Sequence, residues 1–160
     1  MKTIFKILLL TFLFINLYSC TSNDSSPEEE QTTYFIKAKI NGALFESNFP
    51  ITLNNLTEPN VISIQGQTQD NTISVHLYIK NYDGSGTYTA GQGINNQNSL
   101  LITNLDGAFL TDFESGENGT ITIAENGDDL TGTFSFSGFN FQANTSVEVT
   151  EGSFHVTKQL

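Results

Sequence analysis

The chain has 160 residues, with 17 acidic side chains against six lysines and no arginine. This length fits a single domain with a sizeable core. A nucleic-acid partner is excluded, because phosphate backbones require clustered Lys and Arg side chains; the acidity instead indicates a soluble surface.

The first twenty residues have the pattern of a secretion signal. Lys2 and Lys6 give a positive start, and residues 4–17 form an almost continuous apolar run. Such a run is typical of a signal peptide and is too short to span a bilayer with ease. The run ends at the only cysteine of the chain, in the sequence Leu17-Tyr18-Ser19-Cys20.

This end resembles the bacterial lipobox, in which a leucine, a small residue and an invariant cysteine direct lipid attachment. Leu17 and Ser19 match the positions that mark signal cleavage before the cysteine. We therefore expect residues 1–19 to be a signal peptide and Cys20 to be the acylated N-terminus. An ordinary secretory signal and an uncleaved anchor helix are the alternatives. Lipidation is favoured because it leaves no free thiol in an oxidising envelope.

Residues 20–33 are expected to form a lipidated, flexible and acidic tether. After Cys20 this segment consists of Ser, Thr, Asn, Asp, Pro, Gln and Glu, with three glutamates at residues 28–30, so no apolar face is available to fold. An acidic cluster after a lipidated cysteine also resembles the export signal of surface lipoproteins of Bacteroidota. We expect attachment to the outer membrane through the lipid; periplasmic and surface-facing attachment both stay open.

From Tyr34 onward, apolar and polar residues alternate as they do in β-strands. The alternation predicts a strand over 34–40, a turn at Asn41-Gly42 and a return strand over 43–49 that ends at Pro50. Residues 61–80 predict a second hairpin, with its turn at Asp70-Asn71.

Within this second hairpin, one strand has two clearly different faces. Its inward row is expected to be Ile73, Val75, Leu77 and Ile79. The opposite face presents His76, Tyr78 and Lys80, which we single out as candidate surface contacts. Tyr and His are amphipathic residues that often contact partners, although a solvated surface row is the simpler alternative.

The second half of the chain predicts further short strands. They are expected over 87–89, 99–103, 119–124, 130–139 and 146–157, with Phe134 and Phe136 pointing inward and a β-bulge at Gly152. The hairpin that turns at residues 126–129 has the strongest signal. Residues 105–113 do not distinguish between strand and irregular structure.

The predicted fold class is all-β: an antiparallel sandwich or meandering barrel of roughly eight to ten short strands in a single domain over 34–160. No window has the apolar spacing of a long helix in the mature chain.

An ordered set of short motifs adds a family resemblance. The motifs are Phe35–Lys39 before Asn41-Gly42, Gly86-Thr87-Tyr88, Gly119-Thr120-Ile121-Thr122-Ile123, Gly132-Thr133-Phe134-Ser135-Phe136 and Thr150-Glu151-Gly152-Ser153-Phe154. In this order they resemble an uncharacterised lipoprotein family of Bacteroidota. The resemblance implies the fold and the location, and it brings no catalytic residue.

No catalytic constellation is visible, so we expect no enzyme, no cofactor and no metal site. The two histidines, His76 and His155, are far apart in sequence, and no Gly-x-Ser-x-Gly elbow occurs. The paired carboxylates Asp128-Asp129 lie in a predicted turn instead of a rigid cleft.

Calcium is an open alternative for the acidic loop over 106–117. Its oxygen ligands would be Asp106, Asp112, Glu114 and Glu117, although their spacing matches no EF-hand. An ordinary acidic surface loop is the simpler hypothesis.

Two functional hypotheses follow. The first is a non-catalytic binding or interaction module, held at the membrane by its lipid, for an envelope protein or a glycan. The second is a lipocalin-like carrier of a small apolar ligand, with a cavity lined by phenylalanines. The candidate lining is Phe109, Phe113, Phe134, Phe136, Phe139 and Phe141.

Overall fold

A computed structural model describes residues 33–54, 60–91, 98–111 and 118–158. The described residues form eleven strands and no helix. They are β1 (Phe35–Ile40), β2 (Ala43–Ser47), β3 (Ile51–Asn54), β4 (Ile62–Gln67), β5 (Ser74–Ile79), β6 (Gly86–Ala90), β7 (Ser99–Asn104), β8 (Gly107–Thr111), β9 (Gly119–Asn126), β10 (Asp129–Asn140) and β11 (Thr145–Thr157). In these ranges no helix is long and apolar enough to cross a membrane.

All pairings are antiparallel, and the strands follow the order β2-β1-β11-β10-β8-β7-β5-β4-β3. The long strand β10 has β11 along one edge. Along its other edge it pairs first with β9 and then, at Gly138 and Phe139, with β8. β6 extends the sheet beyond β9. The predicted all-β antiparallel class is therefore confirmed.

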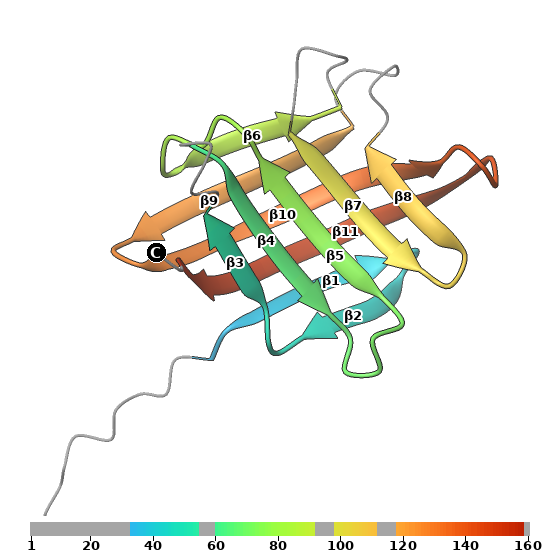
Figure 1. Ribbon diagram of the computed structural model, residues 1–160, viewed down its shortest axis with the longest axis horizontal. Coiled ribbons are helices and arrows are strands. Elements are labelled where there is room, and N and C mark those ends of the chain that lie inside the picture. Colours follow the sequence, from blue (N-terminus) through green and yellow to red (C-terminus); the bar gives the residue numbers. More distant parts are fainter. Residues whose placement is uncertain (1–32, 55–59, 92–97, 112–117, 159–160) are drawn as a thin grey trace, which may run out of the picture. The chain divides into compact units, whose positions relative to one another are not determined.

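The sheet curls into a half-barrel of two facing layers (Figure 1). The front layer consists of β3, β4, β5, β7 and β8, and the back layer of β6, β9, β10, β11, β1 and β2. The layers touch where a Cβ atom on Gly66 of β4 would lie 2.9 Å from Ile36 of β1 and from Ser47 of β2. The sheet thus folds over on itself at β10 and encloses one core.

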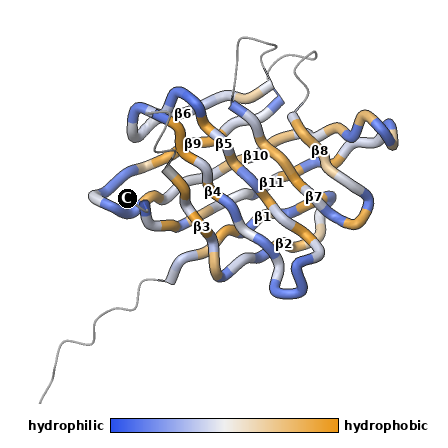
Figure 2. The backbone as a smooth tube through the Cα atoms, viewed as in Figure 1, coloured by the Kyte–Doolittle hydropathy of each residue, from blue (hydrophilic) through white to orange (hydrophobic). Residues whose placement is uncertain are grey.

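The core is made by the inward face of each strand. Figure 2 shows apolar positions recurring along the strands while most turns are hydrophilic. Val75, Leu77 and Ile79 of β5 are buried, as the alternation predicts, and so are Phe134 and Phe136 of β10. These inward rows belong to one hydrophobic cluster.

The turn chemistry matches the predicted hairpins. Asn41 and Gly42 have φ angles of 48° and 83°, which are the left-handed values that a two-residue hairpin turn requires. The hairpin of β9 and β10 turns at Gly127 and Asp128, because Asn126 already pairs with Asp129. The undecided stretch 105–113 contains a turn followed by β8.

Two local features differ from the prediction. β3 was not predicted, although Ile51 and Leu53 flank a buried Thr52 in a short period-two pattern. The predicted bulge is present in β11, but its left-handed residue is Glu151, with φ 52°, and not Gly152. Gly152 instead permits close approach: a Cβ there would lie 2.3 Å from the Phe134 carbonyl oxygen.

Candidate binding surface

The outer face of the front layer is free of formal charge. Strands β3, β4, β5, β7 and β8 contain no Asp, Glu, Lys or Arg. The back-layer strands β1, β2, β9, β10 and β11 each contain at least one such residue. A chain with 17 acidic side chains therefore has one sheet layer without any of them.

Backbone pairing aligns a row of side chains across this outer face. Residues that pair directly on neighbouring strands have Cβ atoms about 4.5–5.5 Å apart and point to the same face. Successive pairings across β3, β4, β5, β7, β8 and β10 join six residues on this face, and we call this set the outer row. Its members, in order, are Ile51, Gln65, His76, Leu101, Leu110 and Phe139. All six are half-buried or exposed, so they form a continuous surface of mainly apolar groups.

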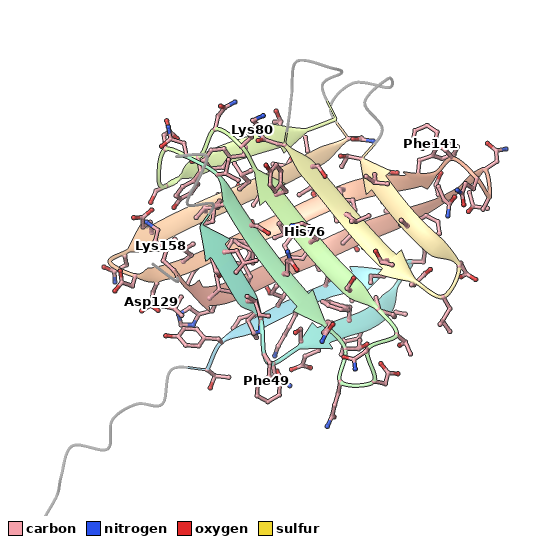
Figure 3. The ribbon with its side chains drawn as sticks, viewed as in Figure 1. Phe49, His76, Lys80, Asp129, Phe141 and Lys158 are labelled. Carbon is pink, nitrogen blue, oxygen red and sulfur yellow. The ribbon has the colours of Figure 1, made fainter. Side chains whose placement is uncertain are left out.

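His76 lies at the centre of the front layer, where Figure 3 shows it on β5. Its Nε2 atom is 2.7 Å from Ser63 Oγ and 3.3 Å from Gln65 Nε2, and Gln65 also donates a hydrogen bond to Ser63 at 3.1 Å. Burial lowers the pKa of His76, which favours the neutral form of the ring. The ring also makes an edge contact with Tyr78, with centroids 6.2 Å apart.

The distance between Ser63 and His76 would suit a nucleophile and its base, but the surroundings do not support catalysis. Ser63 is buried, and the strands that flank β5 contain no carboxylate that could orient the imidazole. We conclude that His76 is a satisfied strand histidine that offers a neutral polar contact.

A shallow hollow of about 180 Å³ lies beside His76 and is open to solvent. Phe49, Ile51 and Leu101 supply its apolar lining, and Gln65 and His76 supply polar groups. Such a hollow can receive an apolar side chain while its rim forms hydrogen bonds.

The structure keeps two of the three candidate contact residues within this surface. Tyr78 lies two residues after His76 on the same face of β5, and it pairs with Ser63 of β4 and Ser99 of β7. Lys80 follows the end of β5, and its backbone N–H donates to Asn98 Oδ1 at 2.9 Å. In Figure 3 it lies at the margin of the layer, away from His76.

His155 belongs to a different part of the domain. Its Nε2 atom lies 3.6 Å from Asp129 Oδ1, and its ring contacts the ring of Tyr34 with centroids 5.3 Å apart. Across the described ranges, no group of three or more His, Cys, Asp or Glu side chains is arranged to hold a metal ion.

Several predicted site residues lie outside the described residues. They are Leu17, Ser19 and Cys20 of the lipobox, and Asp112, Glu114 and Glu117 of the calcium hypothesis. Of the candidate calcium ligands the structure describes Asp106, whose backbone N–H donates to Asn104 Oδ1 at 2.8 Å in the turn before β8.

The candidate phenylalanine lining of a carrier cavity is divided between two sides of the sheet. Phe109, Phe134 and Phe136 are buried in the interior. Phe139 is on the outer face of β10, and Phe141 is 63% exposed and contacts it with ring centroids 5.0 Å apart. Phe113 lies outside the described residues. The described rings therefore do not surround one common space.

A polar cluster at the C-terminal end was missed by the sequence analysis. Glu125 accepts hydrogen bonds from Tyr82 Oη and from Lys158 Nζ. These two hydrogen bonds hold the pKa of Glu125 below its usual range, and the bond from Lys158 has the larger effect. Tyr82 and Lys158 lie 43 and 33 positions from Glu125 in the sequence, so no local sequence pattern could have revealed the cluster.

The curled antiparallel sheet places this chain in the class of all-β half-barrel domains. The chain belongs to the family described as Domain of unknown function (DUF6252), whose model matches residues 32–157. No curated protein and no solved structure was found to match it.

Proposed function

We propose that this protein is a lipid-anchored lipoprotein of a bacterial cell envelope and that its β domain is a non-catalytic module that binds another protein. Cys20 is its attachment point to the outer membrane, and the outer row is its contact surface. The observation that carries the binding proposal is the absence of formal charge from the five front-layer strands.

A protein partner fits this surface better than other ligands do. The cores of protein interfaces are depleted in Asp, Glu and Lys and rich in aromatic and apolar groups. The outer row has this composition, with Leu101, Leu110 and Phe139 in line and His76 and Gln65 between apolar neighbours. A glycan partner would need many hydrogen-bonding groups, whereas four of the six side chains of the outer row are apolar.

Site-specific photocrosslinking in cells tests the location of the contact. We expect a photoreactive phenylalanine analogue at Tyr78 to capture one defined protein. The matched control is the same analogue at Thr122, which is exposed on β9 in the back layer. The same product from both positions, or a product that carries sugar and no second polypeptide, would contradict the proposal.

The captured protein is then purified and its affinity measured against two charge variants. Leu101→Glu places a charge in the outer row and is expected to weaken binding at least tenfold, about 1.4 kcal/mol. Thr122→Glu adds the same charge to the back layer and is expected to leave the affinity unchanged. Equal effects of the two substitutions would show that net charge, and not the outer row, governs binding.

The anchor has a separate test. Metabolic labelling with a fatty-acid analogue is expected to mark the wild-type chain and not the Cys20→Ser variant. Equal labelling of both chains would show that Cys20 is not the acylated residue.

A further inference from the structure

Exposed large apolar side chains are concentrated in one segment of the described domain. The described residues include six of them, and four lie within ten positions of one another. We call these four the apolar edge: Leu44 (72% exposed), Phe49 (87%), Ile51 (50%) and Leu53 (47%). The other two, Leu105 and Phe141, lie in the turns after β7 and β10.

The apolar edge coincides with the two ends of the sheet. Leu44 belongs to β2 and Leu53 to β3, which are the first and last strands in the sheet order. Phe49 lies on the connection between them. Along their outer edges, β2 and β3 pair with no other strand of the described sheet.

The described domain also begins at this place. Ile36 pairs with Ser47, so the residues before β1 lie level with the residues after β2. Thr33 and Tyr34, the first described residues, therefore lie at the same end of the hairpin as Phe49. Figure 3 shows Phe49 on the side of the domain where β1 begins, and Phe141 far from it.

Nearby charges are balanced in spite of the acidity of the chain. Lys37 pairs with Glu46 at 3.3 Å, and Lys39 pairs with Glu151 at 2.7 Å. Both lysines lie on β1, next to the strand that bears Leu44. The apolar edge is thus flanked by paired charges, which lowers the cost of bringing it close to a lipid surface.

We propose that the apolar edge is a membrane-contact site, which inserts its side chains into the headgroup region of the bilayer that holds the acylated Cys20. The inference rests on the proposed lipid anchor. Apolar and aromatic side chains bind the membrane interface, and a tether brings them there at high local concentration. Ile51 also begins the outer row, so Ile51 contacts the membrane and the protein partner binds the rest of the row, from Gln65 to Phe139.

The chain lacks tryptophan, which allows a clean fluorescence test. The full-length acylated protein is reconstituted in phosphatidylcholine vesicles as the Phe49→Trp variant. We expect its emission to lie at shorter wavelength than that of the same variant without the anchor, made with Cys20→Ser and measured in solution. We also expect lipids with brominated acyl chains to quench most of the emission.

Phe141→Trp is the matched control, because it replaces an exposed phenylalanine on the opposite side of the domain. Its emission is expected to stay at long wavelength and to be quenched little.

The outcomes separate the contact site from the anchor. If the protein floats with the vesicles but the emission of the Phe49→Trp variant is not quenched, the anchor holds and the contact site is wrong. A blue shift without quenching would indicate that the edge binds a second copy and would overturn the proposal. If the wild-type chain does not float with vesicles, the anchor fails and the proposed contact fails with it.

Discussion

Phe134 shows how much of the core depends on single aromatic residues. Its side chain is 4% exposed, and its ring lies 6.5 Å from that of Phe154 across the β10–β11 pair. Removing a buried phenyl ring costs about 3–5 kcal/mol through lost transfer energy and the cavity that remains. We therefore expect Phe134→Ala to lower the free energy of unfolding by this amount in urea denaturation.

The control is Phe49→Ala, because Phe49 is 87% exposed. Surface substitutions usually change the free energy of unfolding by no more than about 0.5 kcal/mol. Similar losses for the two variants would mean that Phe134 is not part of the core.

The cluster around Glu125 gives a prediction about pH. Its carboxylate accepts hydrogen bonds from Lys158 and Tyr82, and these bonds lower its pKa in the folded state. A group with a lowered folded pKa contributes stability above its unfolded pKa, which is about 4.3 for Glu. This contribution is lost as the pH falls through that region toward the folded value.

We expect Glu125→Gln to reduce the fall in stability between about pH 5 and pH 3, because the glutamine has no such ionisation. The measurement is the urea midpoint of both chains as a function of pH. Glu148→Gln is the control, since Glu148 lies in β11 outside this cluster. A parallel fall for wild type and Glu125→Gln would rule out Glu125 as the source of the pH dependence.

At the scale of the strands, the sequence predicted most elements but not all of their details. The alternation in β5 and the Asn41-Gly42 turn were correctly predicted, because period-two spacing and left-handed turn residues are local signals. β3 was missed because its four residues give too short an alternation and follow Pro50. The bulge was predicted at Gly152 from the change of parity, and it is present in β11 with Glu151 as its left-handed residue.

Gly152 supplies a prediction about the β10–β11 pair. A Cβ at this position would lie 2.3 Å from the Phe134 carbonyl oxygen and 2.6 Å from Cδ2 of its ring. A backbone carbonyl within the ladder cannot move without separating the strands. We expect Gly152→Ala to cost about 1–3 kcal/mol in urea denaturation, the usual range for overpacking.

Gly86→Ala is the matched control in another strand. Its added Cβ would lie 3.8 Å from the nearest atom, the ring of Tyr88, which is an ordinary contact. That substitution is expected to be neutral or slightly stabilising, because alanine restricts the unfolded chain. If both glycines tolerated alanine equally, the close approach at Gly152 would be refuted.

At the scale of the whole molecule, the candidate surface could be predicted only in part. His76 and Tyr78 were identified because they share the outward face of one strand. Gln65, Leu101, Leu110 and Phe139 were not, because they join the outer row through pairings between strands. The β8–β10 pairing brings Leu110 beside Phe139 across 29 positions of sequence, and local spacing carries no information about such a pairing.

The same topology predicts how the domain opens. β10 is paired along both edges, with β11 on one side and with β9 and β8 on the other. β3 has four residues and pairs in the described sheet only with β4. Hydrogen exchange follows local opening, which is easiest where fewest pairings must break. We therefore expect the amides of β10 and β11 to exchange slowest, and those of β3 to exchange much faster.

The measurement is hydrogen–deuterium exchange of the Cys20→Ser chain in solution without lipid, resolved by peptides over each strand. β6 provides an internal comparison, because it also pairs on one side only in the described sheet, with β9, and lacks exposed large apolar side chains. We expect β6 to exchange at a rate similar to that of β3. Protection of β3 equal to that of β10 would show that its outer edge is covered, and a dependence of that protection on protein concentration would identify a second copy as the cover.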